Sequence, residues 1–285
     1  MNAARNASVA LAQAPIGVFD SGVGGLTVLA ALRATMPAED FIYLGDTARL
    51  PYGTKSGETV VRYALQAADS LVERGVKALV VACNTASAVA LPALRERLTD
   101  TPVLGVVEPG AAAAVAASRT GRIVVIGTEG TVRGGAYQRA IVRLRADASV
   151  TARACQLFVA LAEEGWTEGE VALGAAHRYL DDLFGPGVPL AQRADVLVLG
   201  CTHFPALSGV LEQVAGAGVT LVDSARTTAS AAQQLLASRQ LLRVAEGRAG
   251  ALQLLATDGI ERFARVGSTF LKSAIDPREV QLVDL

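Results

Sequence analysis

Short apolar runs alternate along the chain with longer segments in which apolar residues recur at helical spacing. The runs are typical of buried strands and lie at Ile16–Phe19, Phe41–Leu44, Ala78–Ala82, Val103–Val107, Ile123–Ile126, Val196–Leu199 and Thr220–Val222. The longer segments predict helices at Thr59–Arg74, Ser87–Leu98, Val132–Leu144, Glu168–Phe184 and Ala225–Ser238. Strands that are apolar throughout and separated by helices predict an α/β fold with parallel sheets covered by helices.

Two of the predicted strand–helix units are similar to each other. Residues Ala78–Thr85 and Asp195–Thr202 each contain an apolar strand followed by a cysteine, Cys83 in one and Cys201 in the other. A Pro-Ala-Leu triplet follows in both units. We interpret this as a weak internal repeat with one cysteine in each half, with chance similarity between βα units as the alternative.

The chain is expected to form two lobes. A boundary is predicted near Val107–Gly110, where a strand meets a Pro-Gly pair and a run of alanines. Residues 1–107 plus 224–285 would form the first α/β lobe, and residues 108–223 the second. We expect the strand Thr220–Val222 to return the chain to the first half. Ligands of parallel sheets bind beyond the carboxyl ends of the strands, so the loops at those ends are the first place to look for a site.

Composition narrows the class of protein. The chain has 285 residues, 51% of them hydrophobic, which excludes a disordered protein. Its 26 basic and 27 acidic side chains, with few aromatics, argue against a nucleic-acid surface. The apolar runs are too short to span a membrane, and Met1–Ala14 is too weakly apolar for a secretory signal. Three spaced cysteines and two histidines predict neither disulfides nor a metal site, and favour the cytoplasm.

Cys83 and Cys201 each stand between a predicted strand and a helix. Backbone N–H groups and the helix dipole favour a thiolate there, so we expect a thiol pKa below the usual value of about 8.5. Two matched thiols can remove a proton from a carbon and return one to the opposite face, as a cofactor-free racemase requires. Ser21, Asn84 and Thr85 could stabilise the developing charge. A lone buried cysteine is more often inert.

Four segments carry the most specific signal: GVFDSGVGGLTV at 17–28, YLGDTARLPYG at 43–53, VACNTAS at 81–87 and GCTHFP at 200–205. In this order, over residues 16–225, they resemble the glutamate racemase branch of the cofactor-independent aspartate/glutamate racemase family. The resemblance implies two similar lobes with the active site in the cleft between them. It also implies that Cys83 and Cys201 interconvert L- and D-glutamate as paired acid and base, without pyridoxal phosphate or metal.

In that family the cysteine at the position of Cys83 serves D-glutamate, and the one at Cys201 serves L-glutamate. Family members supply D-glutamate for peptidoglycan biosynthesis, so the resemblance implies a cytoplasmic isomerase of cell-wall biogenesis and cell shape. Glutamate is then the expected partner, with no nucleic acid and no membrane, and a homodimer is a possible assembly.

The resemblance also implies roles for the residues around the cysteines. Asp20 assists the nearby thiol, His203 tunes Cys201, and Glu163 is an auxiliary carboxylate. The substrate-binding residues implied are Asp20, Ser21, Tyr52, Gly53, Asn84, Thr85, Thr202 and His203, with Thr128 and Thr131 near the substrate carboxylate.

Simpler roles remain open for several of these residues. Asp20 could cap a turn, residues 51–53 could be a plain turn, and Asn84, Thr85, Thr128 and Thr131 could cap helices. His203 could be structural. The glycines of residues 22–25 lack the G-x-G-x-x-G spacing of a nucleotide loop and fit a close approach of the backbone.

Residues 155–165 depart from the family pattern, because Gln156 and Ala160 stand where the family commonly has proline. This change could loosen the segment that carries Glu163. Cys155 in the same segment is interpreted as structural. The remaining polar residues are given no role in the site. His177 is interpreted as a surface or packing residue, and Arg262, Arg265 and Lys272 as a solvated face.

Two other functions remain open. A racemase of aspartate or another amino acid could share the same motifs, although residues 51–53 and 201–205 favour glutamate. An amino-acid-binding or regulatory protein could use the cleft without chemistry. Exchange of the substrate α-proton with deuterated solvent separates catalysis from binding.

Overall fold

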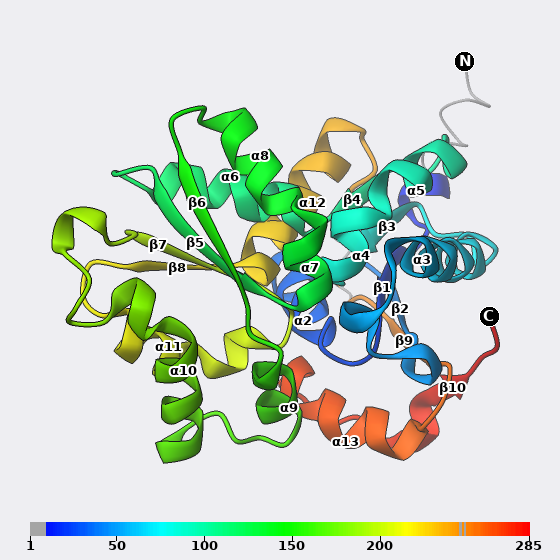
Figure 1. Ribbon diagram of the computed structural model, residues 1–285. Helices are drawn as coiled ribbons and strands as arrows, with labels where there is room; N and C mark the ends of the chain where they lie inside the picture. The colour runs from blue at the N-terminus through cyan, green and yellow to red at the C-terminus, as the bar shows by residue number, and fades with distance from the viewer. Residues whose placement is uncertain (1–9, 245–246, 248) are drawn as a thin grey trace.

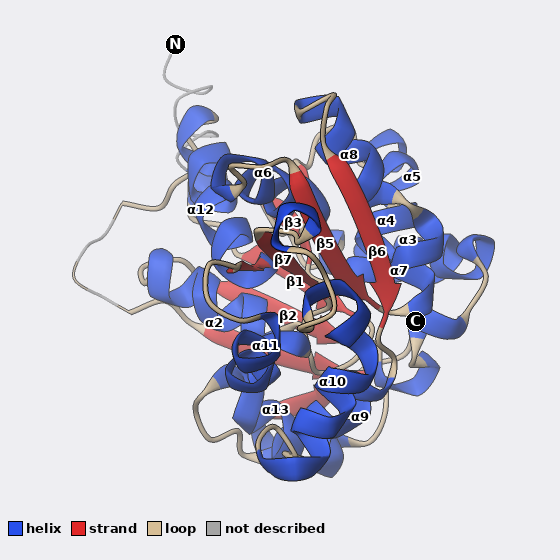
Figure 2. Cartoon of the chain, turned by 60° about the vertical axis from the view of Figure 1, so that its left-hand side comes forward, coloured by secondary structure: helices blue, strands red, loops and turns tan. Residues whose placement is uncertain are grey.

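The computed structural model describes residues 10–244, 247 and 249–285 (Figure 1). Residues 1–9 of the predicted first lobe, and most of the predicted N-terminal extension, lie outside the described residues, as do 245, 246 and 248. The described chain forms two parallel sheets, one of six strands and one of four. Helices cover both, as Figure 2 shows. The predicted α/β fold is therefore confirmed.

The six-stranded sheet has the order β10-β9-β2-β1-β3-β4. Its strands are β1 (Ile16–Asp20), β2 (Phe41–Gly45), β3 (Ala78–Val81), β4 (Val103–Gly105), β9 (Leu252–Ala256) and β10 (Val280–Leu282). Ile16 of the central strand β1 is in register with Phe41 on one side and Ala78 on the other. Every residue of β1, β2 and β3 is buried, which explains why these strands are apolar throughout.

The four-stranded sheet has the order β6-β5-β7-β8. Its strands are β5 (Arg122–Gly127), β6 (Ser149–Ala154), β7 (Val196–Gly200) and β8 (Thr220–Asp223). Within the described residues β8 pairs with β7, in this second sheet. The expectation that this strand returns the chain to the first half is therefore wrong. The return is made by the helix α12 (Ser224–Ser238), which leads to β9 beside β2.

Helices connect the strands in each sheet. They are α2 (Leu26–Thr35), α3 (Gly57–Val72), α4 (Asn84–Val89), α5 (Leu91–Arg97), α6 (Val107–Ala117), α7 (Glu129–Gly134), α8 (Ala136–Leu144), α9 (Leu157–Glu163), α10 (Gly169–Phe184), α11 (Ser208–Ala215), α12 and α13 (Ile260–Leu271). The short 3₁₀ helices are η1 (Thr47–Arg49), η2 (Tyr52–Thr54), η3 (Leu190–Gln192), η4 (Phe204–Leu207) and η5 (Pro277–Glu279).

Two predicted helices are each split in two. The segment Ser87–Leu98 divides into α4 and α5 at Ala90, just before Pro92 in the first turn of α5. Proline is favoured in a first turn and unfavourable inside a helix, so the break lies where the sequence requires it. The segment Val132–Leu144 divides at Gly135, whose φ of 62° ends α7 in the left-handed conformation.

The two sheets share a continuous hydrophobic core. One cluster of buried residues includes Val18 of β1, Leu199 of β7 and Phe263 of α13. The helix α12 packs against α2 and α6, and so joins the parts of the chain that carry the two sheets. This arrangement holds the carboxyl ends of the two sets of strands near each other. Among the described residues, no helix is both long enough and apolar enough to cross a bilayer.

Candidate active site

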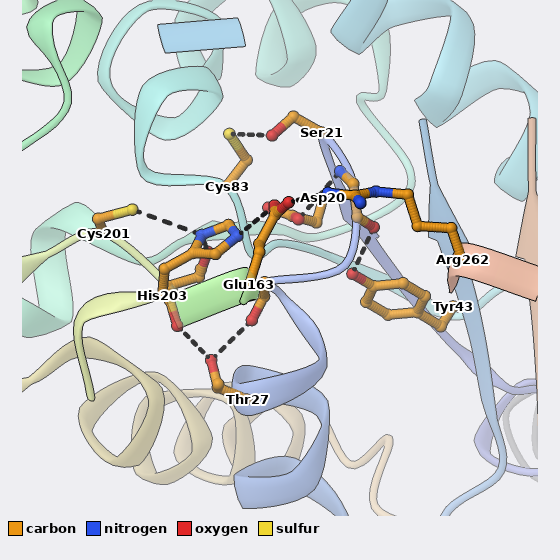
Figure 3. Close-up of polar contacts among 12 residues, drawn as sticks. Asp20, Ser21, Thr27, Tyr43, Cys83, Glu163, Cys201, His203 and Arg262 are labelled. Atoms are coloured by element: carbon orange, nitrogen blue, oxygen red, sulfur yellow. Dashed lines mark hydrogen bonds and ion pairs between the residues drawn. The ribbon is translucent and has the colours of Figure 1, made fainter. Parts of the chain in front are cut away.

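A cavity lies where loops from the carboxyl ends of both sheets meet. Figure 3 shows several side chains that line it, among them Asp20, Cys83 and Cys201. Its lining comes from the segments that follow six strands, β1, β2 and β3 of the first sheet and β5, β6 and β7 of the second. The lining consists of Asp20, Ser21, Gly22, Leu50, Pro51, Tyr52, Gly53, Cys83, Asn84, Thr85, Thr128, Gln156, Val159, Glu163, Cys201, Thr202 and His203. The structure thus brings the catalytic and substrate-binding residues that the sequence predicts into one lining, except Thr131, which lies behind Thr85 and Thr128.

Cys83 lies at the junction of β3 and α4, and its side chain is buried. Its Sγ atom accepts a hydrogen bond from the N–H of Ala86 (3.4 Å) and lies 3.6 Å from Oγ of Ser21. Burial, and then the charge of Asp20, raise the pKa of Cys83 to about 12 against the opposing effect of these hydrogen bonds. The expected lowering of the pKa is therefore wrong for Cys83, because desolvation outweighs the start of a short helix.

Cys201 follows β7 and is the start of a chain of polar contacts. Its Sγ atom lies 3.7 Å from Nδ1 of His203. Nε2 of His203 lies 3.0 Å from Oε1 of Glu163, at the end of α9. Gln156 and Ala160, which stand where the family commonly has proline, therefore do not move Glu163 away from the cavity.

Glu163 has a second partner, which the sequence analysis missed. Nη2 of Arg262, on α13, donates to Oε2 of Glu163 at 2.6 Å. The prediction of a merely solvated face is therefore wrong for Arg262, although half of its side chain is exposed. No local pattern marks this pair, because the two residues are 99 positions apart.

His203 and Glu163 stabilise each other's charged forms. Burial by itself would lower the pKa of His203, but hydrogen bonds with Cys201 and Glu163 outweigh it and raise this pKa to about 10. Burial would raise the pKa of Glu163, and the hydrogen bonds and charges of His203 and Arg262 together lower it. At neutral pH the site therefore holds an imidazolium beside Cys201 and a carboxylate behind it.

Asp20 ends β1 and is fully buried beside the cavity. Its Oδ2 atom accepts the N–H of Gly22 at 3.0 Å, so it does cap the turn, as the simpler interpretation holds. Burial raises the pKa of Asp20 in spite of the nearby His203 and the backbone hydrogen bonds. Tyr43, which the sequence analysis did not single out, fixes the same turn by donating to the carbonyl of Gly22 at 3.1 Å.

Asn84 and Thr85 lie inside the first turn of α4, whose N-cap is Cys83, so the capping interpretation of these two residues is wrong. The hydroxyl of Tyr137 donates to Oδ1 of Asn84 at 2.7 Å. Nδ2 of Asn84 is buried and has no partner among the described residues. A buried donor without a partner is costly, and in a cavity lining it is available to an acceptor on a ligand.

Three threonines form a second polar cluster. Oγ1 of Thr85 lies 2.9 Å from Oγ1 of Thr128 and 3.3 Å from Oγ1 of Thr131. Thr128 is also the N-cap of α7, accepting the N–H of Thr131. The cluster joins the first turn of α4, which follows β3 of the first sheet, to the start of α7, which follows β5 of the second.

Tyr52 forms one wall of the cavity, and its hydroxyl donates to the buried carboxylate of Asp46. Nε of Arg49 lies 2.7 Å from the same carboxylate. The pair Asp46 and Arg49 lies in a matched motif, yet the sequence analysis gave it no role. The carboxylate of Asp46 binds the hydroxyl of Tyr52 and so holds this side chain in place, with its ring as the part that contributes to the cavity.

Two remaining predictions concern residues outside the cavity. Cys155 is fully buried in the hydrophobic core, as expected of a structural residue. His177 is on the exposed side of α10 and lies 2.8 Å from Asp181. Within the described chain, no group of three or more His, Cys, Asp or Glu side chains could hold a metal ion.

Comparisons with known proteins identify the family of the chain. The model of the Asp/Glu/Hydantoin racemase family matches residues 21–232. A glutamate racemase of Geobacter metallireducens is 53% identical over 256 residues, covering 90% of this chain and 92% of the relative. A glutamate racemase structure from Thermus thermophilus, in complex with beta-chloro-D-alanine, has a TM-score of 0.84 at 45% identity, covering 96% and 98% of the two chains. One from Francisella tularensis, in complex with D-glutamate, has a TM-score of 0.86 at 33% identity, with the same coverage. The chain therefore belongs to the Asp/Glu/Hydantoin racemase family and is an amino-acid racemase.

Proposed function

We propose that this protein interconverts L- and D-glutamate by proton transfer between two cysteines, without a cofactor. The observation that carries the proposal is that Cys83 and Cys201, at the ends of strands in different sheets, line one cavity. The similarity to glutamate racemases, one of them crystallised with D-glutamate, supports glutamate as the substrate. The polar side chains in the lining, among them Asn84, Thr85 and Thr202, suit the charged groups of an α-amino acid.

With L-glutamate, Cys201 as thiolate takes the α-proton while Cys83 as thiol delivers its proton to the opposite face. Cys201 ends as a thiol, Cys83 as a thiolate, and the product is D-glutamate. The reverse reaction exchanges the two roles. The raised pKa of Cys83 supports its role as the acid in the first direction.

The surroundings of the cysteines support each half of the transfer. The His203 imidazolium supplies a positive charge next to Cys201. Nδ2 of Asn84, which has no protein partner among the described residues, is a suitable donor to the substrate carboxylate. Such a donor would stabilise the charge that spreads onto the carboxylate as the α-proton leaves.

The division of the chain into lobes fits this function. We propose the lobes as residues 1–107 plus 224–285, and residues 108–223, with the substrate between them. The protein would act in the cytoplasm and supply D-glutamate for peptidoglycan, with glutamate as its partner and neither nucleic acid nor membrane. The predicted homodimer is tested by light scattering on the purified protein.

The decisive experiment follows α-proton exchange by NMR in D₂O, with L-glutamate and D-glutamate supplied separately. The wild type should wash deuterium into both enantiomers and racemise them. Cys83→Ala and Cys201→Ala should lower racemisation by at least about 100-fold. Cys155→Ala is the matched control and should stay within about twofold, because its thiol lies in the core. Full turnover in either of the first two variants would refute the mechanism, and faster turnover of L-aspartate than of glutamate would refute the substrate.

A further inference from the structure

The contacts of Arg262 connect the exposed face of α13 with the sulfur of Cys201. Arg262 binds one carboxylate oxygen of Glu163 at 2.6 Å, and His203 binds the other at 3.0 Å. The opposite ring nitrogen of His203 lies 3.7 Å from Sγ of Cys201. Figure 3 shows Arg262, Glu163, His203 and Cys201 in this order. The chain of contacts crosses between the two sheets, because α13 lies between β9 and β10, whereas Cys201 follows β7.

The same helix touches the imidazole at a second point. The rings of Phe270, on α13, and His203 have centroids 5.2 Å apart at an interplanar angle of 79°. Arg262 and Phe270 are eight positions apart and so lie on similar sides of the helix. The edge-to-face contact fixes the plane of the ring. The ion pair fixes the carboxylate to which Nε2 is bonded.

Stability alone is a weak explanation of this ion pair. The side chain of Arg262 is 51% exposed, and ion pairs that involve exposed groups contribute little to stability. Its partner is unlike a surface carboxylate, because the side chain of Glu163 is only 17% exposed and lines the cavity. Both oxygens of Glu163 have a cationic partner, so the carboxylate cannot rotate without losing one of them.

We propose that Arg262 is a positioning residue for the half of the reaction performed by Cys201: it holds Glu163 so that His203 presents Nδ1 to the sulfur. The proposal rests on the two-cysteine function proposed above. Arg262 does not itself contact the reacting atoms; among the described residues, the cavity lining includes Glu163 and not Arg262. Its removal should therefore lower kcat and leave KM nearly unchanged.

The kinetic test uses Arg262→Ala, Arg262→Lys and Arg262→Gln, with Arg265→Ala as the matched control on the exposed side of α13. L- and D-glutamate have equal free energies, so kcat/KM must fall equally in both directions; we expect a loss of about tenfold for Arg262→Ala and Arg262→Gln. Arg262→Lys, which keeps the positive charge, should retain most of the wild-type kcat/KM. Arg265→Ala should stay within twofold.

The isotope effect separates the two cysteines. Cys201 is proposed to remove the α-proton of L-glutamate. Slower proton transfer at Cys201 should therefore increase the primary kinetic isotope effect measured with α-deuterated L-glutamate. It should not increase that of α-deuterated D-glutamate, whose proton goes to Cys83. The proposal would be overturned by an isotope effect that, relative to wild type, does not increase for L-glutamate or increases equally for both enantiomers. A kcat/KM of Arg262→Ala within twofold of wild type would also overturn it.

A measurement without substrate keeps this test independent of the proposed function. The chain has two histidines, so ¹⁵N-labelled histidine gives one buried ring, His203, and one exposed ring, His177. Arg262→Ala should shift the ring signals of His203 and leave those of His177 unchanged, and Arg265→Ala should shift neither. Unchanged His203 signals would refute the positioning role even if glutamate were racemised. Shifted signals in a protein that racemises no glutamate would refute only the proposed function.

Discussion

A Cβ atom placed on Gly24 would lie 2.4 Å from Cε1 of His203 and 2.4 Å from Oγ1 of Thr202. The loop after β1 therefore approaches the loop after β7 as closely as a backbone without a side chain allows. The sequence predicts a close approach of the backbone at the glycines of residues 22–25, and at Gly24 this approach is the contact between the two halves of the site.

The substitution Gly24→Ala should separate these loops. We expect kcat/KM to fall by at least about tenfold, because even 1 Å of displacement at a catalytic group is costly. Circular dichroism would establish that the variant is folded. Gly174→Ala is the control, since Gly174 lies in α10 with open space around it. It should keep full activity and gain about 0.5–1 kcal/mol of stability; unchanged activity in Gly24→Ala would contradict the prediction.

The hydrogen bond from Tyr137 to Asn84 should be needed for substrate binding. Tyr137→Phe leaves Oδ1 of Asn84 without its donor, so the amide can turn and Nδ2 is no longer fixed in the cavity. We expect KM for both enantiomers to rise about three- to tenfold, the size of one lost hydrogen bond. Steady-state kinetics measure this. Tyr179→Phe, which loses only a bond from the N–H of Leu157, should leave KM unchanged.

Thr27 ties the two halves together, because its hydroxyl lies 3.1 Å from the carbonyl oxygen of Thr202 and 2.9 Å from that of Gly24. Thr27→Val keeps the shape and removes the donor, so we expect a loss of about 1 kcal/mol in unfolding free energy and a severalfold lower kcat/KM. Urea titration and kinetics test the two effects. Thr227→Val is the comparison, since its hydroxyl bonds only within and just before α12. It should affect stability alone.

The stability of the protein should fall as the pH rises above neutrality. The pKa of His203 is raised from 6.5 to about 10 in the folded protein, so this residue contributes stability that is complete below pH 6.5 and is lost by about pH 10. Urea unfolding at several pH values measures the loss. His203→Asn should flatten the profile between pH 6.5 and 9, and His177→Asn should not. A further loss of stability above pH 9 is expected in the wild type and in both variants. The reason is that the pKa of Cys83 is raised to about 12 in the folded protein, where its thiol stays protonated.

The main framework of the fold and the position of the two cysteines followed from the sequence by itself. Buried parallel strands must be apolar throughout, and this local property marked β1, β2, β3, β5 and β7. The strands β6, β9 and β10 were not predicted. They are short or half-exposed and lie at or next to a sheet edge, where the burial that produces an apolar pattern is incomplete.

Only the tertiary structure decided which distant groups meet. Arg262 and Glu163, like Tyr137 and Asn84, pair across many residues, and a polar side chain carries no local sign of its partner. The ionisation of Cys83 was also decided there. A helix after Cys83 was predicted from the sequence, although as the single segment Ser87–Leu98. The degree of desolvation and the buried charge of Asp20 depend on how the two halves of the chain close over the site.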